Sequence, residues 1–220
     1  MLEKLREYNK KLLEDLFLGK IDIYTYKKNI SKATYDFVFK SQEFKDILKE
    51  KLNNFNIEKE IILSFAFKES KINPFAIGDI ETTETYEDSF LHPKLRYSWG
   101  MFQIYAPIHG YIKEGDKIIK ATSGAWVDID RIRIPDIGYQ IQVFCDMYNN
   151  LKNRIKNYSY LKSERYIKRA YEERIITNKE EEEKFIIALR YNGYGESAYQ
   201  YAKDWLDIYK KKLYLSRIKI

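Results

Sequence analysis

The sequence predicts a mainly α-helical fold, and three observations support this. Of the 220 residues, 45% are hydrophobic, enough to bury one sizeable core or, less readily, two small ones. The chain has only 9 Gly and 4 Pro, fewer than a loop-rich β protein needs. Apolar residues recur at spacings of three and four along much of the chain, as on the buried face of a helix. We therefore expect helices around a core.

The first 55 residues are expected to form a helical extension without chemistry of its own. Leucines at helical spacing predict an amphipathic helix from residue 2 to Gly19. Residues 24–54 predict one or two further helices, because apolar positions recur without Gly or Pro. The N-terminus has neither an uninterrupted apolar run nor a small-residue cleavage site, so we expect no secretory signal peptide.

A third helical segment begins near Asn56. This Asn, followed by Glu58 and Glu60, is typical of a capped helix start and predicts a helix over about 57–70. Its apolar stripe ends in a carboxylate, because i, i+3, i+4 and i+7 are Ile62, Phe65, Ala66 and Glu69. A desolvated carboxyl keeps its proton to higher pH and can act as a general acid. The stripe alone favours the structural alternative, in which Glu69 bends outward or pairs with an arginine.

The middle of the chain is predicted to be irregular. Asn73-Pro74 stops the helix, and residues 77–97 predict a long polar loop of the kind that lines a site. A short apolar segment at 98–104 and a second irregular stretch at 108–134 follow. Helical periodicity resumes after Pro135, with Cys145 on the apolar side, where we expect a buried thiol rather than a nucleophile.

Three more helices are predicted at 158–175, 178–192 and 196–213. The acidic run at 180–183 suits a helix N-terminus. The second of these helices repeats the earlier pattern, since its stripe consists of Phe185, Ala188, Leu189 and Asn192. Asn192 is therefore expected on an inward face, and Gly193 and Gly195 end the helix.

Charge and cysteine content narrow the classes of partner. Lys and Arg number 39 and Asp and Glu 33, and the net charge of +6 favours an anionic partner such as nucleic acid, a phospholipid surface or an acidic wall polymer. Basic residues are dispersed, so nucleic acid is not expected. One cysteine excludes an intramolecular disulfide and a cysteine-clustered zinc site. No apolar run approaches the roughly 18 residues of a transmembrane segment.

Three motifs resemble, in the same order, those of the soluble lytic transglycosylases, lysozyme-like enzymes that cleave peptidoglycan. They read FAFKESKINPFAIGD at 65–79, SWGMFQI at 98–104 and ALRYNGYG at 188–195. The family has Glu-Ser before an Asn/Asp-Pro-x-Ala turn, then a Gly-Leu-Met-Gln-Ile-like segment, then Ala-x-x-Tyr-Asn-x-Gly. The match covers about 57–210, and it implies a lysozyme-like catalytic domain over 56–220 beside the helical extension 1–55.

The resemblance implies a role for each matching residue. Glu69 takes the position of the single catalytic acid/base, and Ser70 follows it and bonds nearby groups. The residues expected to border the sugar are Ser70, Met101, Phe102, Gln103, Tyr191 and Asn192. A buried amide at Gln103 and a packed ring at Tyr191 are the structural alternatives. The family mechanism uses no metal and no cofactor.

The chain departs from the family pattern in two places. Gly78 stands where the family commonly has Ser, and a much longer polar loop precedes residue 98, so substrate contacts there do not transfer. Trp99 and Trp126 are candidate sugar-stacking platforms, although a tryptophan that anchors a loop or the core fits equally well.

The implied activity is cleavage of the β-1,4 bond between N-acetylmuramic acid and N-acetylglucosamine with formation of a 1,6-anhydro end. One alternative is a hydrolytic lysozyme or chitinase whose second carboxylate comes from Asp79, Glu81, Glu84, Glu87 or Asp88. Another is a non-catalytic wall-docking structural protein. Because no export signal is expected, we expect a protein made in the cytoplasm that reaches the wall by phage lysis, virion delivery or dedicated secretion.

Overall fold

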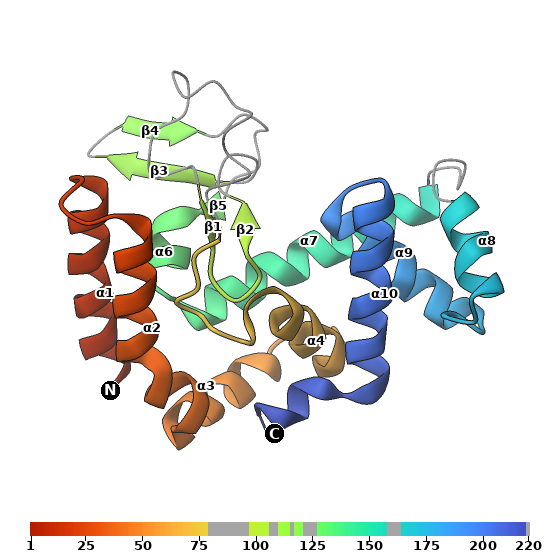
Figure 1. The fold of residues 1–220 in the computed structure, drawn as a ribbon, viewed down its shortest axis with the longest axis horizontal. Coiled ribbons are helices and arrows are strands. Elements are labelled where there is room, and N and C mark those ends of the chain that lie inside the picture. Colours follow the sequence, from red (N-terminus) through yellow and green to blue (C-terminus); the bar gives the residue numbers. More distant parts are fainter. Residues whose placement is uncertain (79–96, 106–109, 115–116, 121–126, 158–163, 219–220) are drawn as a thin grey trace.

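A computed structural model describes the chain except residues 79–96, 106–109, 115–116, 121–126, 158–163 and 219–220 (Figure 1). The fold is mainly helical, as the sequence predicts. Among the residues that the structure describes, no helix is both long enough and apolar enough to cross a membrane.

The first 55 residues form three helices, α1 (Leu2–Phe17), α2 (Ile23–Lys40) and α3 (Gln42–Leu52), which confirms that this part of the chain is helical. Polar side chains fix where two of them begin. Asp22 accepts from the Thr25 amide at 2.6 Å at the start of α2, and Ser41 accepts from the Phe44 amide at 3.0 Å at the start of α3.

Helix α4 (Lys59–Ser70) carries the apolar stripe and Glu69. It begins after Glu58, so the predicted cap at Asn56 is wrong by two residues. The Glu58 carboxylate makes no cap bond and instead accepts from the Tyr209 hydroxyl at 2.9 Å. The helix ends in left-handed backbone at Lys71, and the Ile72 amide closes its last turn onto the Ala66 carbonyl at 2.9 Å.

The middle of the chain contains strands that the sequence analysis missed. Strands β1 (Ser98–Trp99) and β2 (Ile104–Tyr105) pair antiparallel around a turn. A second sheet of order β4-β3-β5 consists of β3 (Gly110–Glu114), β4 (Lys117–Lys120) and β5 (Val127–Asp128), and helix α6 (Ile129–Arg133) follows it. The prediction of an irregular stretch over 108–134 was wrong there, because strands this short show no readable alternation.

The C-terminal part is helical, as predicted. It consists of α7 (Ile137–Asn157), α8 (Glu164–Glu172), α9 (Lys179–Asn192), α10 (Glu196–Lys211) and the 3₁₀ helix η4 (Leu213–Ser216). Helix α8 ends earlier than the predicted residue 175. Cys145 lies buried in α7, and burial raises the pKa of its thiol to about 12, so the thiolate nucleophile is absent at neutral pH.

One hydrophobic core includes residues from Leu2 to Ile218 and therefore joins the extension to the rest of the chain. The Phe37 ring of α2 lies 5.3 Å from that of Phe44 and 6.5 Å from that of Phe75, which follows the end of α4.

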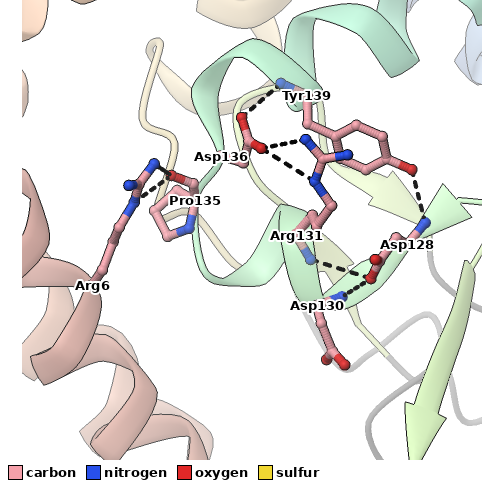
Figure 2. Close-up of polar contacts among 7 residues, drawn as sticks. All are labelled: Arg6, Asp128, Asp130, Arg131, Pro135, Asp136 and Tyr139. Carbon is pink, nitrogen blue, oxygen red and sulfur yellow. Dashed lines mark hydrogen bonds and ion pairs between the residues drawn. The ribbon is translucent and has the colours of Figure 1, made fainter.

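Polar contacts also attach α1 to the turn before α7 (Figure 2). The Arg6 guanidinium donates to the Pro135 carbonyl at 2.8 and 3.0 Å, and the buried Asn9 amide donates to the Arg133 carbonyl at 2.7 Å. Figure 2 further shows that Arg131 of α6 donates to the Asp136 carboxylate on this turn. Both polar contacts and core packing thus hold the extension in place.

Candidate active site

Helix α4, which carries Glu69, packs against α10 (Figure 1). The Phe65 ring is 4.5 Å from the Trp205 ring, and one helical turn further along α4 the Glu69 carboxyl accepts a hydrogen bond from the Tyr201 hydroxyl. A step of four residues forward on α4 therefore matches a step of four backward on α10. This antiparallel register places Tyr201 against Glu69.

The Glu69 carboxyl is half-buried, and desolvation raises its pKa from 4.5 to about 7. The Tyr201 hydrogen bond and the positive charge of Lys68 act in the opposite direction, because both favour the ionised form. Near neutral pH the carboxyl thus populates both its protonated and its ionised form. It can donate a proton in one step and accept one in the next.

Tyr191 lies beside this pair but does not bond Glu69. Its hydroxyl donates to the Phe102 carbonyl at 2.6 Å, and its ring stacks on that of Tyr201 with centroids 6.2 Å apart. Burial raises the pKa of both tyrosines well above 10, so both stay protonated donors at neutral pH. Tyr201 is the residue that the sequence analysis missed. Its position four residues before Trp205 on the apolar face of α10 was the available signal.

Ser70 connects α4 to the second motif, and its expected bonding to nearby groups is confirmed. Its hydroxyl lies 2.9 Å from the Met101 carbonyl and 3.2 Å from the Ala66 carbonyl, and it accepts from the Asn73 amide at 3.0 Å. These contacts fix the turn after Glu69 against residues 98–104.

A buried glutamine that the sequence analysis did not single out supports the same turn. The Gln140 side-chain amide donates to the Pro74 and Ile132 carbonyls at 2.9 and 2.8 Å, and its oxygen accepts from the Met101 amide at 2.9 Å. Gly100 adopts φ +76°, and a Cβ there would come within 2.7 Å of the Gln140 side chain. The close approach therefore requires glycine.

Met101 and Phe102 were expected to border the sugar, but both side chains are buried. The Phe102 ring stacks on that of Phe144 with centroids 4.4 Å apart. The backbone carbonyls of Met101 and Phe102 instead accept the hydrogen bonds of Ser70 and Tyr191, respectively. These two residues position the site from the core.

Gln103 is half-buried, and its side-chain amide donates to the Gly100 carbonyl at 2.9 Å. Its amide oxygen closely approaches Gly78: a Cβ at Gly78 would lie 2.7 Å from this oxygen and 2.7 Å from the Ser98 Cβ. A larger side chain at position 78 does not fit here without a shift, so the close approach of Ser98 and Gln103 favours glycine at this position.

One predicted site residue lies elsewhere than expected, and for Trp99 the structure decides between two open alternatives. Asn192 is exposed at the end of α9, so its predicted inward placement was wrong. Trp99 is buried, with its ring 5.7 Å from Tyr97 and 6.3 Å from Phe17, and it therefore anchors the core. Trp126 and the acidic residues proposed as a second carboxylate lie outside the described residues. Those residues are Asp79, Glu81, Glu84, Glu87 and Asp88.

Comparisons of the chain with protein-family models, curated proteins and solved structures found no match.

Proposed function

We propose that the protein is a peptidoglycan lytic transglycosylase with Glu69 as its single acid/base. The observation that carries this proposal is the Glu69 carboxyl, whose pKa of about 7 suits both proton donation and proton acceptance near neutral pH. The three sequence motifs support the choice of substrate, because Glu69 occupies the catalytic position in the pattern that they resemble. The net charge of +6 also favours the anionic wall polymer.

In the first step, protonated Glu69 donates its proton to the oxygen that joins N-acetylmuramic acid to N-acetylglucosamine, and the bond from C1 to that oxygen breaks. The substrate's own acetamide group stabilises the positive charge that develops at C1, so the step needs no second protein carboxylate. Tyr201 fixes the orientation of the carboxyl and stabilises the charge that remains on it.

In the second step, the Glu69 carboxylate accepts the proton of the C6 hydroxyl while the oxygen of that hydroxyl bonds to C1. The product end is a 1,6-anhydro sugar, and Glu69 regains its proton without the consumption of water. The high pKa of Tyr201 keeps its proton in place throughout, so that it remains a donor to Glu69.

Digestion of purified peptidoglycan by the parent protein and by Glu69→Gln tests this proposal. The parent should release soluble fragments, and the variant should be at least about 100-fold slower, because the proton donor is lost while the shape of the side chain is kept. Glu172→Gln, at an exposed position on α8, is the matched control and should cleave as fast as the parent. Walls left intact by the parent, or equal rates for Glu69→Gln, would overturn the proposal.

A further inference from the structure

A second contact between α4 and α10 lies directly beside Glu69. The Lys68 ammonium is 2.7 Å from the Asp204 carboxylate, and the Gln200 amide donates to the other oxygen of that carboxylate at 2.7 Å. The same ammonium lies 5.4 Å from the centre of the Tyr201 ring, whose hydroxyl donates to Glu69. Asp204 and the Tyr201 ring therefore hold the Lys68 charge at a defined place next to Glu69.

Lys68 is the one cation, among the residues that the structure describes, whose charge acts on the Glu69 carboxyl. The other groups that face this carboxyl are Tyr191 from α9 and Tyr201 from α10, and burial keeps both neutral. Another cation near Lys68 is Lys71 at the end of α4. Desolvation lowers the pKa of Lys71, and so does repulsion from Lys68 and from Arg217 after η4.

Asp204 keeps its charge at neutral pH, because Lys68 and Gln200 hold the pKa of its carboxyl below the ordinary value despite partial burial. Lys68 on α4 thus has a charged counter-ion, the Asp204 carboxylate, on α10. The ion pair is not needed to fill the core, since the Asp204 side chain is 44% exposed and that of Lys68 23% exposed.

We propose that Lys68 and Asp204 are positioning residues for Glu69: the Lys68 ammonium favours the Glu69 carboxylate, the Asp204 carboxylate offsets part of that positive charge, and the pair together sets the fraction of Glu69 that carries its proton at neutral pH. The positive member of the pair favours the Glu69 carboxylate, and the negative member opposes it. Removal of each member alone therefore moves the Glu69 proton equilibrium in opposite directions. General damage to the α4–α10 contact acts in the same direction for both.

The direct test is a titration of the Glu69 carboxyl by ¹³C NMR in the folded protein. Lys68→Met should raise the Glu69 pKa by about 0.5, and Asp204→Asn should lower it by a similar amount, since partly exposed charges act through a high effective dielectric. The Glu69 pKa of the double variant should lie close to the parental value. The Glu69 pKa of Lys68→Arg should equal the parental value. Asp207→Asn is the matched control on α10, because Asp207 pairs with Lys211 at 2.8 Å on the exposed surface, and it should change nothing.

The catalytic part of this inference rests on the proposed function, and a second measurement separates the two. The alkaline limb of the pH profile of kcat/KM on peptidoglycan should follow the NMR pKa in each variant. Opposite changes in the NMR pKa support the inference even if the parent leaves walls intact, in which case only the proposed function fails. Changes in the same direction, or none, overturn the inference even if the parent cleaves walls.

Discussion

At the residue scale, the Glu69 carboxyl makes the stability of the folded protein depend on pH. Its pKa is raised from 4.5 to about 7 on folding, so the folded state binds its proton more tightly than the unfolded state. The resulting contribution to stability is fully present below about pH 4.5 and is lost as the pH rises through about 7. The full loss is at most about 3 kcal/mol, because one unit of pKa corresponds to roughly 1.4 kcal/mol.

Glu69→Gln should therefore stabilise the protein at alkaline pH, since an amide pays no cost of buried charge. We expect the free energy of unfolding to match the parent near pH 4 and to exceed it at pH 8 by up to about 3 kcal/mol. Denaturant titrations at the two pH values measure this difference, with the exposed Glu172→Gln as control. A variant no more stable than the parent at pH 8 would falsify the assigned burial of this carboxyl.

Tyr201→Phe tests the hydrogen bond to Glu69. The hydroxyl favours the ionised carboxyl, so its removal should raise the Glu69 pKa above about 7. NMR titration of the carboxyl measures the change. Tyr209→Phe is the matched control, because Tyr209 also lies on α10 but donates to the exposed Glu58. An unchanged or lowered pKa in Tyr201→Phe contradicts the assigned contact.

The sequence predicted the position of Glu69 on an apolar stripe, because this position follows from spacing within one helix. The stripe left open whether the carboxyl is desolvated, and the structure answers this with a raised pKa. The sequence did not predict Tyr201 as the partner, since that contact depends on the register between α4 and α10, which are far apart in the chain. The prediction that Asn192 faces inward was wrong for a reason that lies within its own helix. Its stripe is real, but the last turn of α9 extends past the buried part of the helix.

At the scale of elements, the turn between β1 and β2 depends on Gln140 of α7. Gln140→Leu should lower the free energy of unfolding by about 3 kcal/mol, because it leaves the buried Met101 amide and two carbonyls without partners. Gln142→Leu, at an exposed position on the same helix, should change it by less than about 0.5 kcal/mol. Equal stability of the two variants, measured by thermal or denaturant unfolding, contradicts this account of the turn.

The long helices were predictable from the sequence, and the short strands were not. Helices such as α1 and α10 repeat their apolar spacing over several turns, so the pattern is clear before any tertiary contact is known. Strands β1, β2 and β5 have two residues each, and their pairing depends on partners elsewhere in the chain. The helix start at Glu58 was missed because tertiary packing, rather than a side-chain cap, determines it.

At the scale of the whole molecule, the three N-terminal helices share one core with α4, the helix that carries Glu69. Phe37→Ala should therefore destabilise the whole chain, by about 3 to 5 kcal/mol, since its ring contacts both Phe44 and Phe75. Circular dichroism and tryptophan fluorescence should report the same lowered transition. Tyr24→Ala, on the same helix but 72% exposed, is the control and should leave both signals near the parent.

A fluorescence transition that stays at the parental midpoint in Phe37→Ala, while the helical signal falls, contradicts the single core. The sequence predicted that the first 55 residues are helical and lack a chemical motif. It did not predict how tightly they join the rest, because the contacts of Phe37, Asn9 and Arg6 reach residues distant in sequence.

The mass of the fragments that the parent protein releases from purified peptidoglycan tests the central claim most directly. A site in which Glu69 is the single carboxylate and the substrate's C6 hydroxyl attacks C1 yields 1,6-anhydro ends. Each of these is lighter by one water than a hydrolysed end. We predict anhydro ends from the parent and none from Glu69→Gln. Hydrolysed ends from the parent, or no fragments at all, contradict the account.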